Sequence, residues 1–194
     1  MDVRGLLTTV NSLHARVAMH AVRVELLRLQ AAAVGLPLLT VEIPSPGTNE
    51  QYERAMQSGV DQLTEQGITH VAFGDLLLED VREYREQQMR RAGLTPVFPI
   101  WGEDTHALAL QMVAEGVKAI VTCVDLKRMP AEFVGREFDE QFLADLPTDV
   151  DPCGENGEFH TFAYAGPAFA HEVRVVRGEV VERDGFVFAD LLPA

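Results

Sequence analysis

Short apolar runs alternate with longer amphipathic stretches along the first half of the chain, and this alternation restricts the fold more than any other feature. The apolar runs have strand length and stop at turn-forming residues, whereas the stretches between them carry apolar side chains at helical spacing. Such an order is typical of an α/β fold with a mainly parallel sheet covered by helices. It predicts strands over 3–10, 38–43, 69–73 and 95–98, and helices over 15–34, 48–66 and 78–92.

A second, smaller α/β unit is expected after the Pro-Ile-Trp-Gly turn at 99–102. Apolar periodicity predicts its helices and strand, and the last residues alternate apolar and polar side chains on either side of Arg177, Gly178 and Glu179. That alternation indicates an antiparallel hairpin at the end of the domain. The predicted domains are 1–100 and 101–194, and the second contains helices over 105–115 and 130–146, a strand over 117–124, and hairpin strands over 172–176 and 180–188.

The charge of the chain limits its partners. A formal net charge of −14 argues against general nucleic-acid binding, because phosphate contacts need a clustered basic surface. The only lysines are Lys118 and Lys127. An anionic substrate is therefore expected to be held by arginines, backbone N–H groups or a metal ion.

The remaining composition indicates a folded protein of the cytoplasm. With 194 residues, 47% of them hydrophobic, the chain can bury a substantial core. No apolar run is long enough to span a bilayer, and the first residues lack the layout of a signal peptide. Cys123 lies in an apolar run and Cys153 in a polar one, which fits reduced thiols better than a disulfide.

Residues 151–162, Asp-Pro-Cys-Gly-Glu-Asn-Gly-Glu-Phe-His-Thr-Phe, form the densest cluster of reactive groups in the chain. Strand-like alternation from Glu158 predicts that Glu158 and His160 project from one face, and Glu155 is expected to reach the same region from the preceding turn. Two interpretations stay open. The segment is either a reactive site, or a hairpin entry with capping carboxylates and a core histidine.

Other polar residues stand where predicted strands end, which is where ligands bind in open α/β sheets. Asp75 follows the third strand directly. Its carboxylate either binds a ligand, as a magnesium ion or a ribose hydroxyl would require, or caps the next helix. Asn11 ends the first strand, and His20 follows on the predicted helix, where a histidine serves either structure or function. Trp101, the only tryptophan, either floors a pocket or packs between domains.

Several of these segments together resemble the diphthamide synthase family, ATP-binding proteins related to diphthine–ammonia ligase. The similarity covers most of the chain, and the Gly-Glu-Asn-Gly-Glu-Phe-His-Thr string is its most specific part. The segments that carry it are 19–23 with 25–27, Gly74-Asp75 with Glu79 and Arg82, 99–101 with Asp104, Gly135-Arg136 with Asp139, and 153–161.

The resemblance implies a Rossmann-like nucleotide-binding domain of the PP-loop (adenine nucleotide alpha hydrolase-like) type, followed by a smaller domain that carries the glutamate-rich motif. It also implies a ligase that uses ATP and Mg²⁺ to adenylate a carboxylate, which ammonia then attacks to form an amide. The implied nucleotide-binding residues are Thr8, Asn11, His20, Gly74 and Asp75, and the implied substrate-binding residues are Glu79, Arg82, Trp101, Arg136, Cys153 and Thr161.

The sequence departs from the family pattern at its start, where the ATP phosphates would be bound. Family members begin with a strand and a Ser-Gly-Gly-Lys-Asp-Ser-like loop that cradles the ATP phosphates. This sequence has no such loop, and its residues 1–7 resemble the strand that follows it. Either the start is placed late, or the loop is lost and the nucleotide-binding domain is incomplete. A lost central strand would expose a sheet edge and favour a homodimer.

In the ligase interpretation, Asp75 or the Glu155/Glu158 pair holds Mg²⁺, and His160 or Glu158 accepts a proton from ammonia while Asn156 orients the acyl group. A thioester at Cys153 is not favoured, because nothing marks a lowered thiol pKa. Two rival classes stay open. Glu155, Glu158 and His160 also suit a metal-dependent hydrolase, and the chain also fits a non-catalytic remnant that binds a nucleotide.

Overall fold

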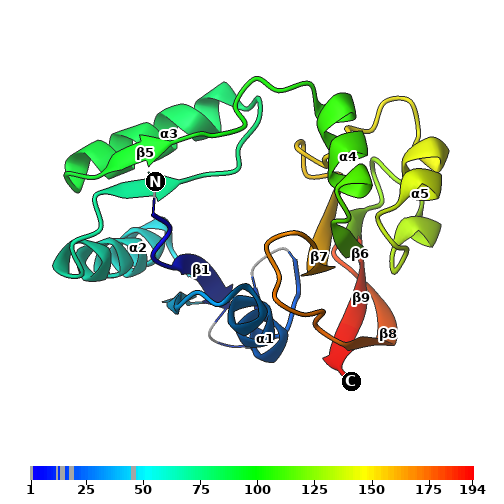
Figure 1. The fold of residues 1–194 in the computed structure, drawn as a ribbon, viewed down its shortest axis with the longest axis horizontal. Helices are drawn as coiled ribbons and strands as arrows, with labels where there is room; N and C mark the ends of the chain where they lie inside the picture. The colour runs from blue at the N-terminus through cyan, green and yellow to red at the C-terminus, as the bar shows by residue number, and fades with distance from the viewer. Residues whose placement is uncertain (1, 12, 14–15, 18–19, 45–46) are drawn as a thin grey trace.

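The computed structural model describes residues 2–11, 13, 16–17, 20–44 and 47–194. The fold is mixed α/β with parallel and antiparallel sheets, which confirms the predicted class at that level. In Figure 1, α2, α3 and β5 lie on one side of the molecule and α4, α5 and the C-terminal strands on the other, with α1 between them.

The four predicted strands of the N-terminal half pair in parallel, but in two separate sheets. β1 (Leu6–Asn11) lies between β3 (Leu38–Ile43), which is parallel to it, and the short antiparallel strand β2 (Arg16–Val17). β4 (His70–Ala72) and β5 (Thr95–Val97) form a parallel pair of their own. The expectation of one mainly parallel sheet is therefore wrong for the described residues, because an apolar run predicts a strand but not its partner.

Helices α2 (Asn49–Glu65) and α3 (Glu79–Arg91) follow the predicted pattern closely. The predicted cap of α2 at Thr48 is confirmed by a capping box, in which Thr48 Oγ1 accepts from the Gln51 N–H at 3.2 Å. Gly59 of α2 faces β3, where an added Cβ would lie 2.5 Å from a methyl of Val41. The glycine therefore sets the close approach of this helix to the sheet.

Helix α1 (Val24–Val34) begins nine residues later than the predicted start at residue 15. Residues 16 and 17 pair with β1 instead, and Arg16 forms an isolated antiparallel bridge with Arg23. Apolar spacing alone could not distinguish these two conformations, because it does not show that residues 16 and 17 fold back on Asn11 and Val10, five and seven positions earlier.

The C-terminal half is built on an antiparallel sheet in the order β7-β6-β9-β8. Its central strand is β6 (Lys118–Asp125), which pairs with β7 (Phe159–Ala165) and with β9 (Phe186–Pro193). The edge strand β8 (Val175–Arg183) completes the predicted hairpin with β9.

The predicted position of the hairpin turn at 177–179 is wrong. The chain turns at Asp184 and Gly185, which both have positive φ, whereas Arg177 and Val180 flank a register shift within β8. Asp-Gly is among the strongest signals for a tight hairpin, so the sequence contained the information needed to place this turn. A bulge tolerates Gly178 inside the strand.

The predicted helix over 130–146 is also wrong in its middle. Only a 3₁₀ turn, η1 (Ala131–Phe133), and a short helix, α5 (Glu140–Asp145), are helical. Between them the backbone hydrogen-bonds to β6, with the Gly135 N–H donating to the Val121 carbonyl at 2.8 Å. These bonds satisfy backbone groups that a helix would otherwise pair internally.

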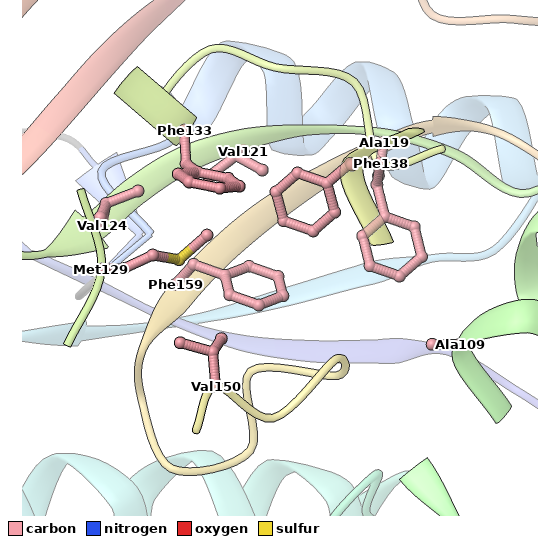
Figure 2. Close-up of a cluster of buried hydrophobic side chains, with 10 residues drawn as sticks. Ala109, Ala119, Val121, Val124, Met129, Phe133, Phe138, Val150 and Phe159 are labelled. Carbon is pink, nitrogen blue, oxygen red and sulfur yellow. The ribbon is translucent and has the colours of Figure 1, made fainter. Parts of the chain in front are cut away.

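Two apolar clusters cover opposite sides of this sheet. One gathers aromatic rings under α4 (Thr105–Ala114) and α5; Figure 2 shows Phe133, Phe138 and Phe159 grouped there beside the buried Val121. The other joins the C-terminal sheet to α1 through Leu26 and neighbouring apolar residues. Helix α1 therefore packs on the C-terminal sheet, although it belongs to the N-terminal half of the chain. No helix in the described part of the chain is long and apolar enough to cross a membrane.

Candidate functional site

The glycine-rich motif forms a compact loop that leads into β7. Asp151 organises its start, because Asp151 Oδ1 accepts from the N–H groups of Cys153 at 2.8 Å and Glu155 at 3.3 Å. Gly154 has φ of +68°, and a Cβ there would lie 2.8 Å from the carbonyl oxygen of Phe159. The tight turn therefore requires glycine at this position.

Glu158 lies at the centre of this loop with an exposed fraction of 0%. Its Oε1 accepts from the Asp151 N–H at 3.2 Å and from Asn156 Nδ2 at 3.0 Å, and its Oε2 accepts from the Asn156 N–H at 3.0 Å. Arg128 Nη1 lies 3.9 Å away. The carboxylate thus holds the loop together, and a substrate or metal would reach it only if the loop opened.

Glu155 links the motif loop to the segment after β4. Its Oε1 accepts from the N–H groups of Leu76 at 2.7 Å and Leu77 at 3.3 Å, across 79 and 78 positions of sequence. Glu155 therefore lies beside the residues that follow Asp75, where its carboxylate binds backbone donors.

Asp75 is held by Arg85, whose Nε lies 2.6 Å from Asp75 Oδ2 and whose Nη2 lies 3.2 Å from Oδ1. The alternative role of Asp75 as a helix cap is wrong, because α3 starts at Glu79 and Leu78 occupies its N-cap without a side-chain bond. Gly74 and Glu79 are exposed on either side of this segment.

Arg82 and Trp101 lie together, as candidate substrate-binding residues should. The Arg82 guanidinium stands 4.6 Å from the centre of the Trp101 ring and 4.9 Å from that of Phe98, and its Nε donates to Glu86 at 2.9 Å. This arrangement orients the guanidinium by cation–π contact and by the ion pair.

His20 and His160 bring the two halves of the chain into contact. Their ring centres lie 4.6 Å apart, and His20 Nδ1 donates to the Thr161 carbonyl at 3.3 Å. Burial lowers the pKa of both rings; that of His160 falls to about 4, with a smaller contribution from His20. Both imidazoles are therefore neutral at pH 7, and each retains a nitrogen that can accept a proton.

The remaining candidates have structural partners. Cys153 Sγ donates to the Thr105 carbonyl at 3.3 Å, and burial, reinforced by Asp151 and Glu155, raises the pKa of its thiol to about 12. A protonated thiol is a poor nucleophile, which agrees with the low expectation for a thioester. Arg136 donates to Asp145 at 2.7 Å over the rings of η1 and α5, and Thr8 lies half-buried in β1 opposite Thr40.

The predicted metal ligands do not gather. Among the described residues, no group of three or more histidine, cysteine, aspartate or glutamate side chains is placed to hold a metal ion. Asp75, Glu155 and Glu158 each have different hydrogen-bond donors as partners, so these carboxylates do not fit a protein-built Mg²⁺ site. The rival metal-dependent hydrolase, which needs Glu155, Glu158 and His160 around one ion, gains no support.

An ion-pair cluster that the sequence did not suggest ties β9 to the segment before α1. Asp190 Oδ1 lies 2.8 Å from Arg16 Nη1, and Asp190 Oδ2 lies 2.6 Å from Arg23 Nη2. Burial by itself would raise the pKa of Asp190, but the hydrogen bonds from Arg23 and Arg16 outweigh it and lower the pKa. No sequence pattern marks a pair 174 positions apart.

Replacing Asp190 with asparagine is expected to lower the free energy of unfolding by about 2 kcal/mol, between the values typical of exposed and fully buried ion pairs. The Asp190 side chain is 18% exposed, so salt should reduce the difference only in part. Urea unfolding at low and high salt measures both effects. Asp184→Asn is the matched control, since the Asp184 side chain is 87% exposed; an equal loss in both variants would contradict the prediction.

Comparison with known proteins matches two family models to successive parts of the chain. The family model for the diphthamide synthase N-terminal domain matches residues 1–96, and the model for the C-terminal domain matches residues 104–189. Met19, in a segment of the resemblance, lies outside the described residues.

Curated relatives are named diphthine–ammonia ligase. The chain is 27% identical over 176 residues to proteins of Bos taurus and Homo sapiens, and 28% identical to one of Danio rerio, each called diphthine–ammonia ligase. The match covers 83% of this chain and 66% of the bovine and human proteins, just under two thirds of their length, and 69% of the zebrafish protein. The two family models together span nearly all of the sequence, and the chain therefore belongs to the diphthamide synthase family.

Proposed function

We propose that this protein takes part in ATP-dependent amide formation, in which ammonia is joined to the carboxylate of a substrate. The relatives are named as ligases that use ammonia, which supports the reaction class. The parallel pairs β1–β3 and β4–β5, with helices between successive strands, are consistent with a PP-loop Rossmann-like domain. The observation that carries the proposal is the contact between His20 and His160, the neutral histidine of the family motif.

His160 is the proton acceptor in this proposal. Ammonia must lose a proton when it attacks an acyl carbon, and His160 is neutral at pH 7 and so can accept one, although its lowered pKa makes it a weaker base than an ordinary imidazole. His20 supplies the position, because its ring contacts His160 while its Nδ1 is bound to the Thr161 carbonyl. Asn156 orients the loop rather than the acyl group, since its side chain donates to Glu158.

Glu155 acts as a positioning residue. Its bonds to Leu76 and Leu77 hold the motif loop beside the segment that carries Asp75, on the edge where β4 ends. ATP, when bound, supplies the activation of the carboxylate. Among the described residues there is no glycine-rich phosphate loop and no cluster of three metal-ligating side chains.

The direct test is incubation of the protein with ATP, Mg²⁺, ¹⁵N-labelled ammonium and a panel of carboxylic acids. We expect AMP, pyrophosphate and a ¹⁵N-labelled amide in equal amounts, with mass spectrometry identifying the amide. His160→Gln should lower the rate about 100-fold, as loss of a general base does. His106→Gln, on an exposed face of α4, is the matched control and should retain activity.

Three results would count against the ligase. Formation of ADP instead of AMP would point to a different phosphate chemistry. ATP consumption that does not depend on ammonium would show that ATP cleavage is not coupled to amide formation. Nucleotide binding without turnover, seen by calorimetry with ATP and AMP, would favour the non-catalytic alternative.

A further inference from the structure

A cavity of about 460 Å³ lies between the segment that precedes α1 and the C-terminal hairpin. This volume falls in the range of roughly 300 to 1,000 Å³ that small-molecule sites occupy. Most of its wall is apolar, and its polar groups include Asn11, Arg16 and Asp190. The apolar lining consists of Val17, Ala21, Val181, Phe186, Phe188 and Ala189.

This cavity shares a face of the C-terminal sheet with the histidine pair. Directly paired residues in antiparallel strands project to the same side, and the pairing runs from His160 to Cys123, from Cys123 to Phe188, and from Phe188 to Val181. Phe188 and Val181 line the cavity. With neighbouring strands roughly 4.8 Å apart, His160 lies about two strand spacings from the cavity wall.

One polar group of the cavity, Arg16, is bonded to the segment that carries His20. Arg16 Nη1 donates to the Ala21 carbonyl at 2.6 Å, and Ala21 directly follows His20. The same nitrogen binds Asp190, whose carboxylate also receives Arg23. Two guanidinium groups thus face one carboxylate, and of the two only Arg16 lines the cavity.

Two N–H donor groups of Arg16 are available to a ligand. Only its Nη1 is bonded, and its Nε and Nη2 have no hydrogen-bond partner in the part of the chain that the structure describes. A guanidinium edge with two such donors matches a carboxylate in geometry. The acids Glu179 and Asp184 stand at the rim with Arg183, and all three are solvent-exposed, so salt and water screen them.

We propose that this cavity binds a carboxylic acid with an apolar, ring-sized body, its carboxylate on Arg16 and its body against Phe186, Phe188 and Val181. The inference deepens the proposed function, since such an acid would be the acyl substrate of the ligase.

Calorimetry with phenylacetate and its neutral analogue phenylacetamide, without ATP, tests the cavity independently of any ligase activity. We expect the acid to bind about tenfold more tightly than the amide, because only the acid forms a charge-assisted pair with Arg16. Arg16→Gln should abolish that preference while leaving amide binding within about twofold.

Two neighbouring valines of β8 provide a matched pair of variants. Val181 lines the cavity and Val180 does not, and both are well exposed, at 50% and 60%, so a polar residue is tolerated at each. Val181→Asp should weaken phenylacetate at least tenfold through charge repulsion in the apolar wall, whereas Val180→Asp should leave it unchanged within about twofold.

Equal effects of the two aspartates, equal affinity for acid and amide, or no binding of phenylacetate by the wild-type protein would each overturn the assignment. If phenylacetate binds as expected but no amide forms in the presence of ATP, the assignment of the cavity is supported and the proposed ligase activity is not. Amide formation from acids that do not respond to Val181→Asp would support the ligase and reject the cavity.

Discussion

Replacing Glu158 with alanine is expected to lower the free energy of unfolding by about 3 kcal/mol, although the residue belongs to the family motif and not to an ordinary core. Three donors lose their acceptor at once: the N–H groups of Asp151 and Asn156, and the side-chain amide of Asn156. Because the site is fully buried, water cannot replace the carboxylate without reorganising the loop. Urea unfolding followed by far-UV circular dichroism measures the loss.

Two further variants sharpen this prediction. Glu158→Gln keeps the shape and one acceptor oxygen but turns an N–H₂ group toward donors, so we expect a loss of about 1 to 2 kcal/mol. Glu132→Ala, at an exposed position of η1, should change stability by less than about 0.5 kcal/mol. A Glu158→Ala protein as stable as the wild type would mean that the carboxylate does not organise the loop.

Stability is expected to fall as the pH drops from neutrality toward 4, with about 3 kcal/mol of the loss coming from His160 alone. The folded pKa of His160, about 4, lies below the unfolded value of 6.5. Between these values the unfolded chain binds a proton that the folded chain does not, so acid favours unfolding. The stability contributed by the neutral ring is fully present above about pH 6.5, and about 2 kcal/mol of it is lost by pH 5.

Carboxylates also titrate in the lower part of this range. The contribution of His160 to stability is therefore obtained by comparing the wild type with a variant that lacks the imidazole. Unfolding free energies of the wild type and of His160→Gln, measured by urea titration at pH 7, 6, 5 and 4, provide that difference. The gap between the two proteins should change across the window, because only the wild-type unfolded chain takes up a proton at residue 160. Parallel curves for the two proteins would contradict burial of an uncharged imidazole.

These two predictions assign different tasks to residues that are only two positions apart. Glu158 stabilises the loop and has no exposed surface, whereas His160 is half-buried and retains chemical capacity as a neutral base. The hypothesis that Glu155, Glu158 and His160 form one reactive centre is therefore not supported in that form. The structure pairs each of them with a different partner.

The sequence predicted the elements whose signals are local. Thr48 and Gln51 form the cap expected at the start of α2, and the apolar run at 117–124 corresponds to β6 within one residue at either end. The motif at 151–158 was recognisable as a turn-rich loop, because its glycines and Asp151 determine its backbone directly.

Tertiary structure decided the features that depend on remote partners. The middle of 130–146 became extended and not helical because β6 offered hydrogen bonds. The contact of His20 with His160 joins residues 140 positions apart. Local propensity is worth tenths of a kcal/mol per residue, so packing and hydrogen bonds between distant segments prevail wherever the two disagree.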